Sequence, residues 1–129
     1  MRRWLATLFL AAPAALAGTP ADLLGAYEAQ AKRAGAAFAG FSAARGAALY
    51  RGGGSATCAS CHSPSPLQPG RHARTGKSIA PLAPAANPAR LTDPAKTEKW
   101  FGRNCRDVLA RDCTAQEKGD FVRFLMNAN

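Results

Sequence analysis

The chain has 129 residues, and 17 Lys or Arg against 8 Asp or Glu give it a formal net charge of +9. A chain of this length forms one domain with a small core, which excludes a multidomain architecture. The positive charge favours an acidic partner and salt-sensitive association, and the export predicted from the N-terminus argues against nucleic acid as that partner.

The first 17 residues read as a secretory signal peptide. Arg2 and Arg3 form a short basic start, and an apolar stretch runs over 5–16. Ala15 and Ala17 place small residues at the two positions that a signal peptidase reads. This run is too short for a membrane-spanning helix, which needs about 20 apolar residues. We therefore expect cleavage after Ala17 and a single domain over 18–129 that is periplasmic and not embedded in a membrane.

The first half of the mature chain predicts two helices. The first is expected over 20–35, where apolar residues recur at helical spacing: Leu23, Leu24, Tyr27 and Ala31. The second is expected over 42–51, with Ser42 as its cap and three glycines directly after it.

A long loop should follow over 63–88, because prolines interrupt it throughout: Pro64, Pro66, Pro69, Pro81, Pro84 and Pro88. Loops of this length in a compact domain usually have a functional reason. Wrapping the edge of a bound group would be such a reason.

Two further helices are predicted near the C-terminus. Asp93 is a good cap and Pro94 suits a first helical position, so a helix should run from there towards Asn104. The last helix should begin at Thr114, which forms a capping box with Glu117. The chain shows no strand pattern and no repeat, so the fold class expected is all-α.

The run Cys58-Ala59-Ser60-Cys61-His62 is the C-x-x-C-H signature of c-type haem attachment. Two thiols at this spacing reach the two vinyl groups of one porphyrin and form thioethers. The next residue, His62, then places an imidazole nitrogen on the iron from the same side. The prediction is one covalently bound haem c, with His62 as the proximal ligand.

Two other interpretations fit this motif less well. A thioredoxin-like redox pair would follow a strand and precede a helix, whereas here glycines precede and a proline-rich loop follows. A zinc site would need a second close pair of ligands, but Cys105 and Cys113 lie far along the chain and are eight residues apart.

The groups around the iron are less well defined by the sequence. His62 needs an acceptor for its other nitrogen, and the Pro81 carbonyl is the candidate. For the opposite face, Met126 is the one methionine of the mature chain, although packing is its commoner use, and His72 is more typical of an exposed loop residue. Trp100 and Asn104 share one helix face, which would put the Trp against the haem and the Asn near the iron if that face covers the distal side.

Three further segments, 74–84, 99–105 and 111–114, resemble the sphaeroides haem protein family, and with the attachment motif the similarity covers nearly all of the mature chain. The run Gly102-Arg103-Asn104-Cys105 is its specific part. The sequence departs from the family over 63–72. Arg71, Arg74 and Lys77 remain candidates for the haem propionates.

The resemblance implies a class I cytochrome c fold with helices wrapped around the haem. It implies that His62 and Asn104 are the two iron ligands and that Cys105 and Cys113 form a disulfide. In that family the asparagine leaves the iron on reduction, and the ferrous haem then binds oxygen or nitric oxide. The family also exchanges electrons with a dihaem cytochrome c and a membrane b-type cytochrome.

Two functions follow as expectations. The first is one-electron transfer combined with redox-dependent binding of O2 or NO at the position vacated by Asn104. The alternative is a plain six-coordinate electron carrier with Met126 as the sixth ligand. An enzyme is less supported, because no distal His, Arg or acid is placed to deliver protons.

Overall fold

The computed structural model describes residues 17–35, 37–52 and 56–129. Its elements are α1 (Pro20–Arg33), α2 (Ala43–Arg51), α3 (Cys58–His62), β1 (Gly70–Arg71), β2 (Ser78–Ile79), α4 (Pro94–Leu109) and α5 (Ala115–Asn127). The expected signal peptide falls almost wholly on 1–16, which lie outside the described residues. Within the described part, no helix has the length and apolar character needed to cross a membrane.

The longer helices begin directly after capping residues, and the caps of α2 and α5 are those predicted from the sequence. Thr19 and Asp22 form a capping box at α1, the Ser42 side chain accepts the Arg45 amide at α2, and Thr114 and Glu117 form the box at α5. These caps satisfy backbone N–H groups that have no partner inside the helix. The all-α prediction is confirmed, and α4 is longer than expected because it continues past Asn104 to Leu109.

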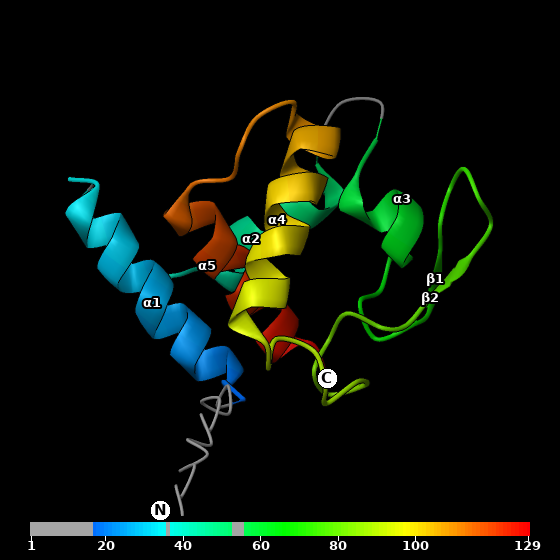
Figure 1. The fold of residues 1–129 in the computed structure, drawn as a ribbon, viewed down its shortest axis with the longest axis horizontal. Helices are drawn as coiled ribbons and strands as arrows, with labels where there is room; N and C mark the ends of the chain where they lie inside the picture. Colours follow the sequence, from blue (N-terminus) through cyan, green and yellow to red (C-terminus); the bar gives the residue numbers. More distant parts are fainter. Residues whose placement is uncertain (1–16, 36, 53–55) are drawn as a thin grey trace, which may run out of the picture.

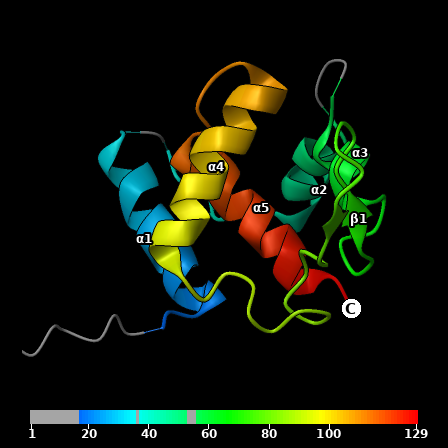
Figure 2. The same ribbon diagram turned by 45° about the vertical axis from the view of Figure 1, so that its right-hand side comes forward.

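Helix α5 is the centre of the fold. It packs against both α1 and α2, and Figure 2 shows it between them. Leu23, Leu24 and Tyr27 of α1 are buried against Val122 of α5. On the other side α2 approaches so closely that a Cβ atom at Gly46 would lie 2.0 Å from the Asp120 carbonyl oxygen. Gly46 therefore sets the distance between α2 and α5.

A continuous row of aromatic rings crosses the interior from α1 to the end of α5. Neighbouring centroids lie 5.3–6.1 Å apart, which is the usual range for attractive ring pairs. In order, the rings are Tyr27, Phe101, Phe121, Tyr50 and Phe124. The row thus joins residues of α1, α4, α5 and α2 in one apolar core, and these four helices make up the left and central parts of the ribbon in Figure 1.

The segment after α3 corrects one expectation, because it is not wholly irregular. Strands β1 and β2 pair antiparallel, with Gly70 opposite Ile79. The turn between them closes through a hydrogen bond from the His72 amide to the Lys77 carbonyl and through Gly76 at φ +69°. Strands of two residues are too short to show a period in the sequence, so the hairpin left no pattern to predict it.

Candidate cofactor-attachment site

The attachment motif forms its own short helix, α3. Thr57 caps it through a capping box with Ser60, so the turn is fixed by residues inside the motif and directly before it. Cys58 and Cys61 are both free and half-buried. Residues three apart on a helix are neighbours on one face, so both thiols are presented on the same side.

Tyr50 of α2 holds the C-terminal end of α3. Its ring is fully buried against Phe121 and Phe124, and its hydroxyl donates to the carbonyl oxygens of His62, at 3.0 Å, and of Ser63. Burial raises the pKa of Tyr50 to about 12, and the nearby Cys58 adds to the effect. The hydroxyl therefore stays a donor at all physiological pH values and fixes the backbone directly after the motif.

The hairpin lies against the other side of α3. A Cβ atom at Gly70 would lie 2.0 Å from the Cys61 carbonyl oxygen and 2.6 Å from the His62 Cα, so only glycine fits there. The Ala73 amide also donates to the Cys61 sulfur at 3.4 Å. The attachment helix is thus fixed from two sides, by α2 and by the hairpin.

The His62 ring is poised as a neutral ligand. Burial lowers its pKa, and the positive charge of Arg90 lowers it further. A neutral imidazole is the form that binds a metal. Its Nδ1 is buried and has no hydrogen-bond partner among the described residues.

The hydrogen bond expected from His62 to the Pro81 carbonyl is not formed. That oxygen instead accepts from Arg90 Nε at 2.9 Å and from Asn87 Nδ2 at 3.4 Å. The physical reason is that a carbonyl oxygen has two lone pairs and these two donors already occupy them, so the His62 Nδ1 has no partner among the described residues. The sequence pointed to the acceptor but not to the competing donor.

These observations fit a haem bound through the motif. Two reduced thiols share a face, the next residue is a half-buried neutral imidazole, and its Nδ1 is an orphaned buried polar atom. Burial raises the pKa of Cys58, which keeps it as a thiol. Thiols and one imidazole in this order would hold the porphyrin at two points and its iron at one.

The residues predicted for the opposite side of the iron lie on α4. Asn104 is half-buried and forms no hydrogen bond through its side chain to another described residue, while Trp100 is 43% exposed with the Arg103 guanidinium 5.7 Å from its ring centroid. Helices α3 and α4 stand apart in both views (Figures 1 and 2). No described contact joins Asn104 to His62, so the pairing of these two ligands stays a prediction.

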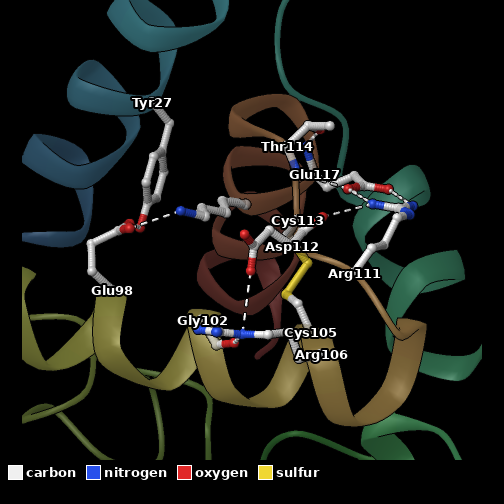
Figure 3. The surroundings of a disulfide bond; sticks show 11 residues. Tyr27, Glu98, Gly102, Cys105, Arg106, Arg111, Asp112, Cys113, Thr114 and Glu117 are labelled. Atoms are coloured by element: carbon white, nitrogen blue, oxygen red, sulfur yellow. Dashed lines mark hydrogen bonds and ion pairs between the residues drawn. A yellow bond between two sulfur atoms is a disulfide. The ribbon is translucent and has the colours of Figure 1, made fainter.

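A disulfide follows Asn104 directly. Cys105 and Cys113 are bonded, with their Cα atoms 5.7 Å apart, and the bond ties α4 to the segment directly before α5 (Figure 3). Arg106 lies 3.4 Å from Asp112 across the same turn. The backbone behind Asn104 is thereby held, while its side chain is left without a partner.

The two other candidate ligands lie elsewhere. Met126 is on the surface near the end of α5. His72 is in the hairpin turn, and its Nδ1 accepts the amides of Arg74 and Thr75, both at 3.2 Å. That nitrogen is therefore committed to the turn, which leaves only Nε2 for any other contact.

Three residues that shape the site were not predicted from the sequence. Tyr50, Gly70 and Arg90 contact α3 or the loop beside it from 8 to 13 positions away along the chain, and no local spacing marks them. One signal was present for Arg90: the segment 29–92 contains no Asp or Glu, so a buried cation within it has no nearby carboxylate in sequence.

Comparisons with known proteins show which family the chain resembles. A family model described as a domain of unknown function (DUF1924) matches residues 36–125. The cytochrome c-type protein SHP of Cereibacter sphaeroides is 45% identical over 133 residues, which cover 97% of this chain and 98% of that protein.

Two solved structures share the fold. Oxidised SHP, described as an oxygen-binding cytochrome c, superposes with a TM-score of 0.74 at 44% identity, over 84% of this chain and 96% of its own. The solution structure of Methylophilus methylotrophus cytochrome c'', described in terms of haem-ligand detachment, has a TM-score of 0.75 at 33% identity, over 84% and 92%. The resemblance and fold predicted from the sequence are thus confirmed, and the chain belongs to the sphaeroides haem protein family of c-type cytochromes.

Proposed function

We propose that this chain is a periplasmic monohaem cytochrome that passes single electrons and, when reduced, binds a diatomic ligand such as O2 or NO where Asn104 lies in the oxidised form. The observation that carries the proposal is the pair of free thiols on α3 followed by the neutral, half-buried His62. The haem, when bound, supplies a one-electron couple and a coordination position for a small ligand.

The residues of the chain have separate roles in this proposal. Cys58 and Cys61 form the two thioethers, and His62 is the permanent ligand, held by Tyr50 and the hairpin. Asn104 is the exchangeable ligand, because an amide oxygen is a hard, weak and neutral donor that prefers the oxidised iron. Since Cys105 is bonded to Cys113, the disulfide would limit how far the backbone of α4 follows when the Asn104 side chain rotates away.

The relatives support both halves of the proposal. SHP is described as an oxygen-binding cytochrome c and cytochrome c'' in terms of haem-ligand detachment. By the family resemblance, the electron donors proposed are a dihaem cytochrome c and a membrane b-type cytochrome. Cleavage after Ala17 removes Arg2 and Arg3, so the net charge of +9 becomes +7 in the processed chain. This positive charge favours an acidic docking surface on such a donor and a reaction that slows as salt is added.

Covalent attachment is tested by mass spectrometry of the protein secreted from a host that matures c-type cytochromes. We expect a mass equal to the processed chain plus one haem. The double variant Cys58→Ser/Cys61→Ser should have the mass of the bare chain, whereas Cys105→Ser/Cys113→Ser should keep the haem. A wild-type protein with the bare mass and no Soret absorption would refute the proposal at its base.

Ligand exchange is tested by optical spectra of the secreted holoprotein, oxidised and then reduced, before and after carbon monoxide is added. We expect the reduced protein to bind carbon monoxide, and Asn104→Ala to keep the haem but change the oxidised spectrum. Asn127→Ala, at the end of α5, is the matched control and should change neither spectrum. If Asn104→Ala leaves the oxidised spectrum unchanged, Asn104 is not the ligand. A reduced protein that ignores the gas would support the plain carrier with Met126.

A further inference from the structure

Arg90 is a half-buried cation that no carboxylate accompanies. It lies in the loop before α4, where its Nε donates to the Pro81 carbonyl at 2.9 Å and its Nη2 to the Ala80 carbonyl at 2.8 Å. Among the described residues, which include every Asp and Glu of the chain, none forms an ion pair with it. Burial lowers the pKa of Arg90, with nothing negative nearby to offset the effect.

The free-energy cost of burying the Arg90 charge is not offset by any carboxylate of the chain. Moving a charge out of water costs free energy unless an opposite charge and enough hydrogen bonds replace the water. The two carbonyls use two of the five N–H donors of the guanidinium, and neither carries a charge. A site of this kind suits a further acceptor that is negative and planar, since the guanidinium fork matches a carboxylate.

The position of Arg90 points to where that carboxylate comes from. Its guanidinium is bonded to the carbonyls of Ala80 and Pro81, which directly follow β2. Strand β2 pairs with β1, and Gly70 of β1 packs against the backbone of Cys61 and His62, so Arg90 is tied to the part of the molecule that carries the attachment helix. The segment 29–92 contains no Asp or Glu that could reach Arg90. A haem attached through α3 would bring two carboxylates of its own, the propionates.

We propose that Arg90 binds a haem propionate and that the Ala80 and Pro81 carbonyls hold its guanidinium ready for that contact. This inference rests on the proposed haem attachment and replaces Arg71, Arg74 and Lys77 as the leading candidates. Those three residues are exposed on the hairpin, and the Arg71 Nη1 is turned back to the Gly76 carbonyl at 2.8 Å. Exposed cations of this kind contribute little to a defined contact.

The test uses Arg90→Gln and Arg90→Lys in the secreted holoprotein. Thioethers keep the haem in place whatever happens to the propionates, so mass spectrometry should show full loading of every variant. The readouts are the midpoint potential and the propionate bending band in resonance Raman spectra. Arg74→Gln is the matched control, since it removes the same charge from an exposed site in the hairpin.

We expect Arg90→Gln to lower the midpoint potential, because loss of the positive charge beside a propionate favours the more positive oxidised state. The expected change is about tenfold in the equilibrium constant for one-electron reduction, or about 59 mV. Arg90→Lys keeps the charge and should recover most of the potential, although it loses the fork geometry. Only the two Arg90 variants should shift the propionate band.

The outcomes separate this inference from the proposed function. A haem-loaded Arg90→Gln with the wild-type potential and Raman band would overturn it, even if the variant unfolds at a lower temperature, because that pattern marks a purely structural residue. An equal fall in potential in Arg74→Gln would also overturn it. If Arg90→Gln is not secreted, a wild-type Raman band in Arg90→Lys would refute it and a shifted band would support it. Absence of haem from the wild type would refute the proposed function instead.

Discussion

The two halves of the molecule are held together by different polar groups. On the side of α4 and α5, carboxylates join the elements: Glu98 accepts from Tyr27 at 2.6 Å and from Lys118 at 2.7 Å, and Asp120 accepts from Arg45 at 2.7 Å. Over 29–92 there is no acidic residue, and backbone carbonyls take that place for Tyr50 and Arg90.

This difference shows in which part of the fold cations lack carboxylate partners. On the carboxylate side each partly buried carboxylate forms an ion pair with a cation, so its charge is balanced within the chain. Lys32 and Arg45, at the start of the segment 29–92, still reach Glu28 and Asp120. Arg71 and Arg90, further along it, meet only backbone carbonyls, which agrees with a region built to receive a group with carboxylates of its own. Three predictions test this contrast, from the largest expected effect to the smallest.

Replacing Asp120 should have the largest effect on stability. Its side chain is 3% exposed and accepts from the Ser42 amide, from Arg45 and from Gln116. Asp120→Asn removes the charge and turns one acceptor into a donor, so the free energy of unfolding of the holoprotein should fall by about 3 kcal/mol. Guanidinium unfolding followed by circular dichroism measures it.

The matched control for this experiment is Glu28→Gln, which removes an exposed ion pair with Lys32 on α1. It should change the free energy of unfolding by about 0.5 kcal/mol or less. Equal losses in the two variants would contradict the view that Asp120 is the central tie between α2 and α5.

On the carbonyl side, Tyr50→Phe should lower the free energy of unfolding by less than Asp120→Asn does. The ring stays packed, but the carbonyls of His62 and Ser63 lose a donor in a buried place, at a cost of about 1.5 kcal/mol. Tyr27→Phe is the counterpart on the carboxylate side. It should cost less, because Glu98 keeps Lys118 and half of its side chain reaches water. Guanidinium unfolding followed by circular dichroism compares the free energies of unfolding of the two variants. A larger loss in Tyr27→Phe than in Tyr50→Phe would contradict the contrast between the two sides.

The smallest effect should be a pH dependence that comes from Glu98. Burial raises its pKa, but hydrogen bonds from Lys118 and Tyr27 outweigh this and leave the pKa below the ordinary value of 4.5. The stabilisation is therefore present above pH 4.5 and is lost as the pH falls below it through the folded-state pKa. It amounts to about 0.5 kcal/mol, because solvent screens the pair.

Unfolding measured from pH 6 to pH 3 should show this contribution as the difference between the wild type and Glu98→Gln. Lys118→Met keeps the carboxylate but removes the stronger partner, so it should retain part of the slope. A slope in Glu98→Gln as steep as in the wild type would assign the acid sensitivity to another group.

The sequence predicted the parts of this fold that local chemistry controls. Thr114 with Glu117, and Asp93 with Pro94, mark helix starts because a cap and its partner lie within one turn. The attachment motif was equally plain, since Cys58, Cys61 and His62 must be neighbours for their chemistry. For these features, spacing along the chain is the same as spacing in the structure.

The parts that could not be predicted depend on contacts between distant segments. Nothing near Gly70 indicates that its missing side chain makes room for the Cys61 carbonyl, and nothing near Pro81 indicates that Arg90 will take its oxygen. Asn104 is the intermediate case. Its shared helix face with Trp100 follows from spacing, but its role came from the family resemblance, and its pairing with His62 stays a prediction.

The separation of the four cysteines bears on how such a chain would mature. A thiol is oxidised or exchanged through its thiolate, and burial raises the pKa of Cys58, so that this form is scarce. The fold meanwhile brings Cys105 and Cys113 together in a disulfide bond, so neither is available to pair with another cysteine. In an oxidising compartment, folding before ligation would thus guard Cys58 against mispairing, and the order of these events would affect the yield of correctly bonded protein.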